Sequence, residues 1–237
     1  MTFDEFLSRI DDRRKTIVAY SSAETPDHLE GFETRNATVE YRRLPAGAEG
    51  FVVVREGSEF VGSVSLAELE RLLEPPLVRP QNLEDLSSGY RALYDVLEET
   101  LFSTLDRRQL LAASREIENR AWRVGEGTLR VGFQRLSAAE AQRSIYADLA
   151  SETDLEVHVY GRANGDLPEI PGVTAHALGR TREVVDYWFL TFDGGPDSGQ
   201  ACALLAEERA PDEYVGFWTY DRELVEELAA YVRETFG

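Results

Sequence analysis

The spacing of apolar residues along the first part of the chain predicts one helix followed by several strands. Phe3, Phe6 and Ile10 recur at helical spacing, so a helix is expected over residues 2–14. The apolar runs after it are short and bounded by turn residues, which is typical of strands. These expected strands are TIVAYS, ATVEYRRL and the two arms of FVVVREGSEFVGSVS.

The next expected features are a hairpin and a short helix. Gly57 and Ser58 supply turn chemistry between the two arms of the last apolar run, so the arms should pair as a β-hairpin. A helix, LAELERLLE, should begin after Ser65, because Glu68 stands at the capping-box position three residues later.

A proline-rich stretch divides the chain. The helix has to stop at Pro75 and Pro76, because proline has no amide hydrogen and restricts the residue before it. The segment PPLVRPQNLEDLSSG is therefore the expected linker. It separates an N-terminal α/β part with a hairpin, residues 1–80, from a second part, residues 90–237, although the two parts could share one core.

The second part combines helices with a run of strands. YRALYDVLEETLFSTL predicts a helix, Asp106 should cap the next one, which ends at Gly125, and Ser137 should cap a helix over 138–150. The expected strands are TLRVGFQ, LEVHVYG, VTAHALG, VDYWFLTFDG, QACALLAEE and YVGFWTYD, and Asp221 should cap a last helix with the buried stripe Leu224, Val225, Leu228 and Val232. Strands joined by short loops and flanked by helices predict an α+β fold with mainly antiparallel sheets.

The charge balance limits the partners and the location. The chain carries 44 acidic and 25 basic residues, a formal net charge of −19, and Lys15 is its one lysine. Dispersed acidic charge indicates adaptation to a salt-rich cytoplasm, where the Debye length falls to about 3 Å at 1 M; an ordinary acidic protein is the alternative. The charge disfavours direct contact with nucleic acid. No signal peptide and no apolar run of about 18 residues is found, so a cytoplasmic protein off the membrane is expected.

The residues that commonly carry chemistry give little support for a reaction. The three histidines have no metal-ligand spacing, so no metal site is expected, and no catalytic residue can be named, so an enzyme is not expected. The segment FDGGPDSG lacks the spacing of a calcium or phosphate loop and is expected to be a hairpin connection. The lone Cys202 excludes an internal disulfide and lies in an apolar strand, so it should belong to the core.

Aromatic residues gather on two of the expected strands and could line an apolar pocket with a few polar groups. The residues proposed to bind a ligand are Arg115, Glu118, Phe133, Gln134, Trp188, Trp218 and Tyr220. The alternative is that the aromatics are ordinary core and that Arg115 and Glu118 simply pair along one helix.

Several phrases of the second part resemble the DICT sensory domain. They are LLAASREIENRAWRVGEGTLRVGFQRLS, IYADLA, VHVYG, WFLTFDGGPDSGQACALLAEE and GFWTYDRELV, within residues 95–237. The first 80 residues are similar to the extension of stand-alone versions from salt-loving archaea. The positions that carry the resemblance are Ser114, Arg115, Glu118, Phe133, Gln134, Tyr146, Asp193, Trp218 and Asp221.

The resemblance implies a sensory and signal-transduction module that takes a small-molecule or other signal and passes it on through protein contacts. It implies no particular cofactor, ligand or catalytic residue. A protein partner in a signalling pathway and a homodimer are the expected assemblies. An interaction or scaffold protein without a small ligand is the alternative function.

Overall fold

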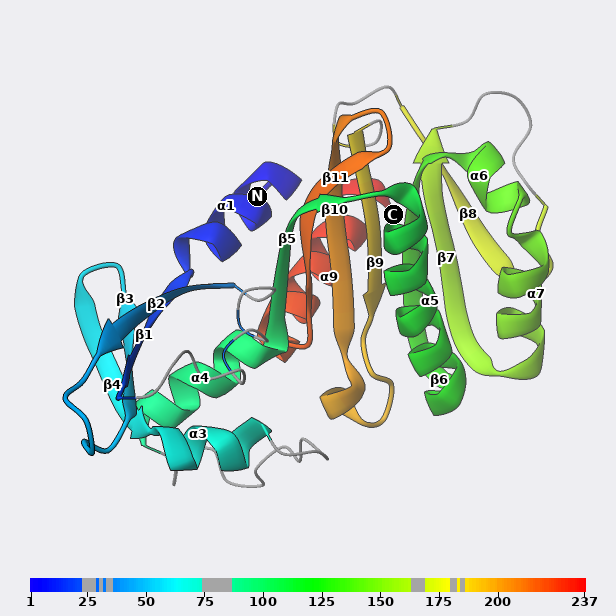
Figure 1. Ribbon diagram of the computed structural model, residues 1–237. Coiled ribbons are helices and arrows are strands. Elements are labelled where there is room, and N and C mark those ends of the chain that lie inside the picture. The colour runs from blue at the N-terminus through cyan, green and yellow to red at the C-terminus, as the bar shows by residue number, and fades with distance from the viewer. Residues whose placement is uncertain are drawn as a thin grey trace. The chain divides into compact units, whose positions relative to one another are not determined.

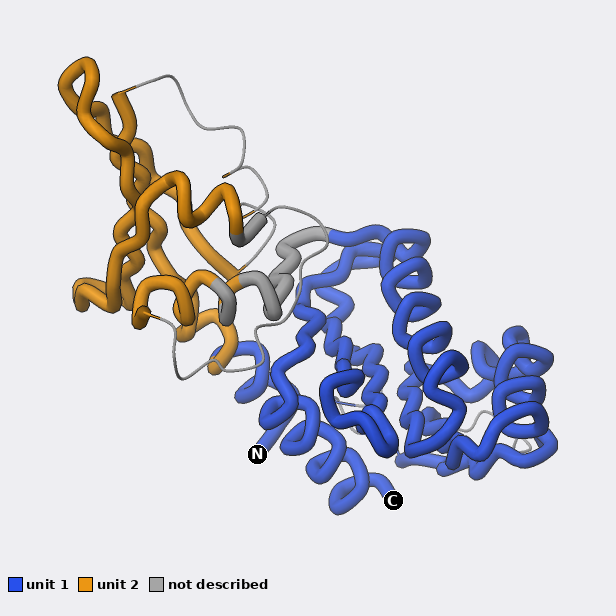
Figure 2. Tube along the Cα trace, turned by 90° about the horizontal axis from the view of Figure 1, so that it is seen from below, with its two compact units in different colours: residues 1–8, 102–237 blue, residues 9–101 orange. Residues whose placement is uncertain are grey.

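The computed structural model describes residues 1–22, 29, 32, 36–73, 87–162, 169–179, 183 and 186–237. The chain forms two compact units, coloured separately in Figure 2: unit 1 holds Met1–Ser8 and Phe102–Gly237, and unit 2 holds Arg9–Leu101. Most of the predicted linker, residues 75–86, lies outside the described residues, and the predicted division near residues 80–90 stays a prediction. No helix in the described part is long and apolar enough to cross a membrane.

Unit 2 is built on a mixed four-stranded sheet in the order β2-β1-β3-β4. Strands β1 and β2 are parallel, whereas β1–β3 and β3–β4 are antiparallel. Its elements are the end of α1 (Phe3–Asp12), β1 (Lys15–Ser21), β2 (Ala37–Arg43), β3 (Phe51–Glu56), β4 (Glu59–Ser65), α3 (Leu66–Leu73) and α4 (Ser88–Glu98).

Two local predictions in unit 2 are confirmed, and glycines bring a helix close to its sheet. The hairpin turns between β3 and β4, and Ser65 and Glu68 form the capping box, with the Glu68 amide donating to Ser65 Oγ over 3.2 Å. Helix α4 packs on β4 where Gly62 faces Gly89. A methyl group on Gly62 would meet the Gly89 amide nitrogen at 2.3 Å, so only a residue without a side chain allows this contact.

Unit 1 is built on a seven-stranded sheet in the order β5-β11-β10-β9-β6-β7-β8. Its elements are β5 (Glu99–Leu105, which begins in unit 2), α5 (Arg107–Val124), β6 (Glu126–Arg135), α6 (Leu136–Glu140), α7 (Arg143–Glu152), β7 (Asp154–Arg162), β8 (Val173–Leu178), β9 (Tyr187–Phe192), the 3₁₀ turn η3 (Ser198–Gln200), β10 (Cys202–Ala210), β11 (Glu213–Thr219) and α9 (Arg222–Phe236).

Helices cover both faces of the seven-stranded sheet (Figure 1). Helices α5, α6 and α7 lie on one face, where alternate residues of the strands, such as Leu129, Val131 and Leu204, form the main core. Helix α9 lies on the other face, and its predicted stripe is buried as expected. The start of the chain also packs in unit 1, since the Phe3 ring lies 5.1 Å from Tyr187 between ring centroids.

The α+β class is confirmed, but the sheets are mixed and not mainly antiparallel. Strands β6, β7 and β8 run parallel to one another, and β9, β10 and β11 continue the sheet antiparallel. The connection between β6 and β7 carries helices α6 and α7, which gives the chain enough length to return to the same end of the sheet.

Two of the predicted helices are wrong in part. The segment 99–105 is strand β5 at the edge of the sheet and does not extend the helix before it. β-branched and aromatic residues alternate with others there, a pattern that suits a strand beside β11. Ser137 is not a cap either: a short helix already starts at Leu136, and a second one begins at Arg143 after the break at Ala141 and Gln142.

Candidate functional site

Helix α5 supports most of the candidate site, and its ends are fixed by local contacts. The Gln109 amide donates to Asp106 Oδ1 over 2.8 Å, and the Asp106 amide donates to Gln109 Oε1 over 2.9 Å, so the predicted cap is a complete capping box. Gly125 ends the helix in the left-handed region at φ 74°. The helix therefore has a defined inner face, on which Ile117 and Glu118 are buried in the interior of unit 1.

A buried polar network joins α5 to α7. The Glu118 side chain is 4% exposed, pairs with Arg115 on the same helix, and accepts a hydrogen bond of 2.6 Å from the Tyr146 hydroxyl. Arg115 also donates to the amide oxygen of Gln142, which precedes the first residue of α7. The two predicted residues Arg115 and Glu118 thus pair with each other and hold α7.

The network has unusual proton affinities. Burial raises the pKa of Glu118 above its ordinary value, although the hydrogen bond from Tyr146 and the charge of Arg115 oppose this. Burial, together with the nearby Glu118 carboxylate, raises the pKa of Tyr146 well above its ordinary value. The Tyr146 hydroxyl therefore keeps its proton, and the Glu118 carboxyl takes one up more readily than an exposed carboxyl does.

Phe133 and Trp188 lie beside this network as packed core. The Phe133 ring meets Tyr146 edge-on with centroids 6.0 Å apart, and it lies 5.8 Å from Trp188. Their exposed fractions are 2% and 5%, so the two predicted residues are enclosed by other side chains. Edge-on and tilted contacts of this kind stabilise a core.

Trp218 and Tyr220 line a hollow on another side of α5. It encloses about 240 Å³, counting the open space at its mouth, and its walls are mostly apolar. The lining residues are Ala113, Glu116 and Ile117 from α5, Cys202 and Ala203 from β10, and Trp218, Thr219 and Tyr220 at the end of β11. The hollow thus has one wall on the helix that carries the buried network.

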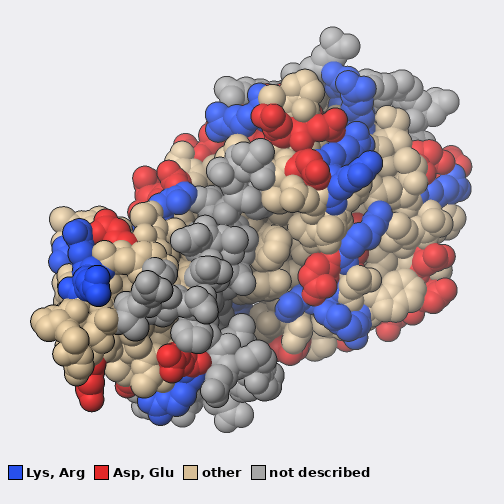
Figure 3. All heavy atoms as spheres, viewed as in Figure 1, with Lys and Arg blue, Asp and Glu red and all other residues tan. Residues whose placement is uncertain are grey.

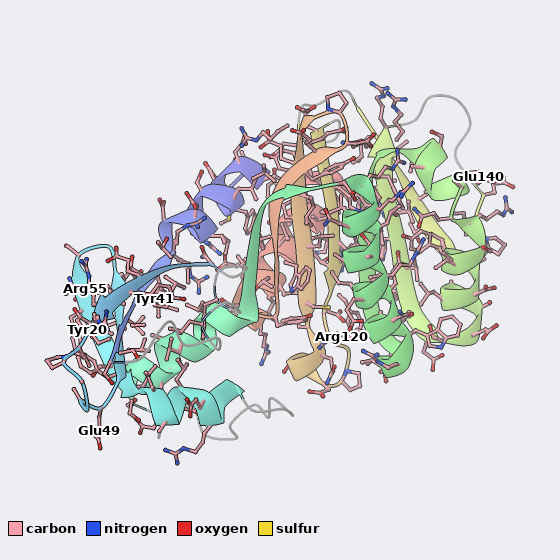
Figure 4. The ribbon with its side chains drawn as sticks, in the orientation of Figure 1. Tyr20, Tyr41, Glu49, Arg55, Arg120 and Glu140 are labelled. Carbon is pink, nitrogen blue, oxygen red and sulfur yellow. The ribbon has the colours of Figure 1, made fainter. Side chains whose placement is uncertain are left out.

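Polar groups stand at the rim and in the wall of the hollow. The Arg120 guanidinium, labelled in Figure 4, lies 4.6 Å from the centroid of the Tyr220 ring, and its Nη1 donates to Gln200 Oε1 over 3.3 Å. Trp218 Nε1 is buried and has no acceptor among the residues that the structure describes. Burial raises the pKa of the Cys202 thiol to about 12, so the predicted core cysteine is a neutral wall group.

The structure therefore separates the seven predicted ligand-binding residues. Arg115 and Glu118 form the network, Phe133 and Trp188 are core, and Trp218 and Tyr220 line the hollow, as described above. Gln134 lies apart and donates to the carboxylate of Glu208. Sequence reasoning missed Gln142 and the role of Cys202 as a wall, because both depend on contacts between segments far apart in the chain.

The surface over α5 carries both signs of charge. Figure 3 shows arginines in a broken line across this face with carboxylates beside them. Arg123 pairs with Glu116 over 3.5 Å, and Arg143 pairs with Glu140 over 3.2 Å. Exposed pairs of this kind contribute about 0.2–1 kcal/mol each, so they shape the surface more than they stabilise the fold.

Comparison with known families assigns the part of the chain that holds these features. Residues 90–209 match the model of the DICT family, described as a sensory domain in diguanylate cyclases and two-component systems. The match spans half of the chain. The chain belongs to the DICT sensory-domain family. The DICT match includes the network and the Cys202 wall of the hollow but ends before Trp218 and Tyr220.

Similarity to other proteins is low. No curated protein matches the DICT chain. A polyphosphate kinase from Porphyromonas gingivalis is 10% identical with a TM-score of 0.38 and aligns with 98% of this chain, which spans 48% of the kinase chain. NucT from Helicobacter pylori is 12% identical with a TM-score of 0.38, over 57% of this chain and 93% of the NucT chain. Neither likeness supports an argument about function.

Proposed function

We propose that this DICT protein senses a small molecule that binds in the hollow beside α5 and passes the signal to a partner protein. The observation that carries the proposal is that one helix forms a wall of the hollow through Ile117 and holds the buried network through Glu118, the next residue. A ligand that displaces Ile117 therefore also changes the position of Glu118. The relay to a partner would then run through α7, which the network holds.

The character of the hollow supports a small, mostly apolar ligand. Ligand pockets usually enclose about 300–1,000 Å³. The 240 Å³ of this hollow include the open space at its mouth, so its enclosed part is much smaller and favours a molecule of very few atoms. Trp218 Nε1 offers a donor for which the described part of the chain provides no acceptor, and satisfying such a buried group is worth about 1–3 kcal/mol. A very small apolar molecule with one acceptor atom would suit the volume of the hollow and the Trp218 donor.

The chain is proposed to act without catalysis. Glu118 and Tyr146 are 3% and 1% exposed as whole residues, so a substrate cannot reach them in this conformation. The Cys202 thiol is neutral and buried, which makes it a poor nucleophile.

Native mass spectrometry on protein purified in molar KCl tests the proposal. A co-purifying small molecule is expected, and it should be lost or weakened in Trp218→Phe, which removes the indole donor and keeps an aromatic ring. Trp122→Phe is the matched control, since Trp122 lies on α5, is 40% exposed and does not line the hollow. Equal retention of the molecule in both variants would show that it binds elsewhere.

Hydrogen exchange tests the relay separately. Binding should change the exchange of amides in α7, and Tyr146→Phe should reduce that change because it removes the hydrogen bond to Glu118. Ligand binding without any change of exchange in α7 would be consistent with ligand sensing but would exclude a relay through α7.

Exposed apolar residues on unit 2 favour a second candidate, a protein-binding surface that needs no small ligand. On one face of the sheet, Phe60 is 60% exposed and Phe51 36%, and Phe51 stacks on Tyr20 with ring centroids 4.7 Å apart. Tyr41, 40% exposed, lies on the other face, since its cross-strand partner is the buried Ala19. Figure 4 shows Tyr20 and Tyr41 on the strands of the small sheet. If this surface makes dimers, light scattering should detect them, and Phe60→Ser should shift them to monomers; a monomeric wild-type protein would exclude self-association.

A further inference from the structure

The outer strands of the seven-stranded sheet bring together two histidines that are far from both α5 sites in sequence. His158 lies on β7 and His176 on β8, which pair in parallel. The register places Thr174 opposite His158 and Tyr160 opposite His176, so the two imidazoles are diagonal neighbours on one face of the sheet. Nδ1 of His158 lies 3.1 Å from Nε2 of His176.

Neighbouring rings hold this pair in place. The Tyr160 ring stacks on His176 with centroids 4.3 Å apart and planes at 7°, and it lies 6.4 Å from His158 at 24°. Tyr160 itself is 1% exposed, so it is a fixed support. Both histidines are half-buried, which leaves them within reach of solvent. The two nitrogens are thus positioned before anything binds.

We propose that His158 and His176 form a two-histidine clamp for a divalent transition-metal ion of the Zn²⁺ and Cu²⁺ class. Imidazole nitrogen is a preferred ligand for these ions. Zinc–nitrogen bonds of about 2.0–2.1 Å at a tetrahedral angle put two ligand nitrogens about 3.3 Å apart, close to the separation found here. Small rotations of the two rings would admit the ion, and water would fill its other positions.

The clamp is weaker than a structural zinc site. Among the residues that the structure describes, no group of three or more His, Cys, Asp or Glu side chains is arranged around a metal position. The Arg130 guanidinium, opposite His158 on β6, acts electrostatically on both imidazoles and opposes a cation. Glu156 acts on His158 in the other direction. Removing the Arg130 charge should therefore strengthen metal binding.

A shared proton is the competing explanation, because 3.1 Å also suits an N–H···N hydrogen bond between neutral rings. The two explanations differ in how the rings respond to a metal. Zn²⁺ is a suitable probe because it is redox-inert and leaves the NMR spectrum free of paramagnetic broadening.

The first experiment follows the imidazole nitrogens of the full chain by NMR while Zn²⁺ is added. The chain has three histidines, so the spectrum is simple to assign. One equivalent of Zn²⁺ should shift the signals of His158 and His176 and leave those of His28 in place. Unmoved signals for the pair would overturn the metal site and leave a shared proton. This measurement needs no variant and so does not depend on a variant folding.

Calorimetry then distinguishes Zn²⁺ binding at the clamp from Zn²⁺ binding at the many surface carboxylates. His158→Asn and His176→Asn should each weaken the strongest binding event about tenfold or more, whereas the control His28→Asn should not change it. Arg130→Gln should tighten it several-fold, since a nearby positive charge is removed. Equal affinities in the wild type, in both clamp variants and in Arg130→Gln would assign the binding to carboxylates and reject the clamp.

Discussion

Glu118 is a buried carboxylate that is retained because its polar neighbours offset the cost of burial. Removing one member of such a set leaves the others without a partner, which is usually more destabilising than the net contribution of the set itself. Arg115 is 34% exposed on its side chain, so water can partly replace the missing partner. The expected effect is therefore moderate.

Glu118→Gln should lower the free energy of unfolding by about 1–3 kcal/mol. The amide nitrogen that replaces one carboxylate oxygen cannot accept the hydrogen bond from Tyr146 or Arg115, so one buried donor is left unsatisfied. Urea unfolding followed by circular dichroism measures this. Glu116→Gln is the control: Glu116 pairs with Arg123, both are more than half exposed, and the change should stay within about 0.5 kcal/mol. Equal losses in both variants would contradict a special role for the buried pair.

The titration of Glu118 should make the free energy of unfolding depend on pH. Its pKa is raised in the folded state, so the folded chain holds this proton at pH values where the unfolded chain, with an ordinary value of 4.5, has released it. The contribution of Glu118 to the free energy of unfolding therefore falls as pH rises above 4.5 and recovers as pH is lowered. Between pH 7 and pH 5 the wild type should gain stability relative to Glu118→Gln; a constant difference would show that the carboxyl titrates normally.

Cys202 should be silent towards thiol reagents in the folded protein. It is 1% exposed, and burial raises its pKa to about 12, so hardly any thiolate is present near pH 8. Before urea is added, a chromogenic disulfide reagent should react with less than about a tenth of the Cys202 thiol. In urea it should react with all of it. Fast reaction in the absence of urea would mean that the hollow beside α5 opens readily.

At the scale of elements, the Phe189 ring of β9 can lie over β6 because Gly132 has no side chain there. A methyl group at Gly132 would meet the Phe189 ring at 2.0 Å, because the two residues are direct partners on the paired strands. Gly132→Ala should therefore destabilise unit 1 by about 1–3 kcal/mol through overpacking. Thermal unfolding checks this, with Gly179→Ala as the control because no atom of the described residues lies within 4 Å of a methyl group there.

The elements that the sequence predicted correctly are those defined by local chemistry. The caps at Asp106, Asp221 and Ser65 involve residues two or three positions apart, so their sequence pattern contains the whole interaction. The pairing of strands is not local. Strand 99–105 continues an apolar helical pattern and is a strand because β11 is available beside it, and the parallel pairing of β6 with β7 depends on two helices between them.

The contacts of the candidate site are likewise of two kinds, local ones that the sequence spacing indicates and non-local ones that it does not. Arg115 and Glu118 are three residues apart on one helix, and their pairing could be predicted. Tyr146 is 28 residues from Glu118, and the Gln134 partner Glu208 is 74 residues away, so no spacing in the sequence indicates these contacts. The spacing of the three histidines predicts no metal site, and it cannot reveal that His158 and His176 are neighbours, since only the register of β7 and β8 brings these two together.

At the scale of the whole molecule, a net charge of −19 should make stability depend on salt. Repulsion among like charges destabilises the compact state, and salt screens it. The thermal unfolding midpoint should rise as KCl is increased from 0.1 to about 1 M, where the Debye length is about 3 Å. NaCl should give the same rise if screening is the cause; a midpoint that falls or stays constant in both salts would show that the acidic surface is not self-repulsive.

Unit 1 contains the first eight residues of the chain as well as its last 136, and this has a consequence for the order of folding. The Phe3 amide donates to Glu183, 180 residues away, and the Tyr187 hydroxyl donates to Asp4, 183 residues away. On a ribosome that adds about 5–20 residues per second, these first residues wait roughly 10–35 seconds for their partners. Residues 9–101 emerge complete within that interval, so the inserted unit has time to fold before the unit that surrounds it in sequence can close.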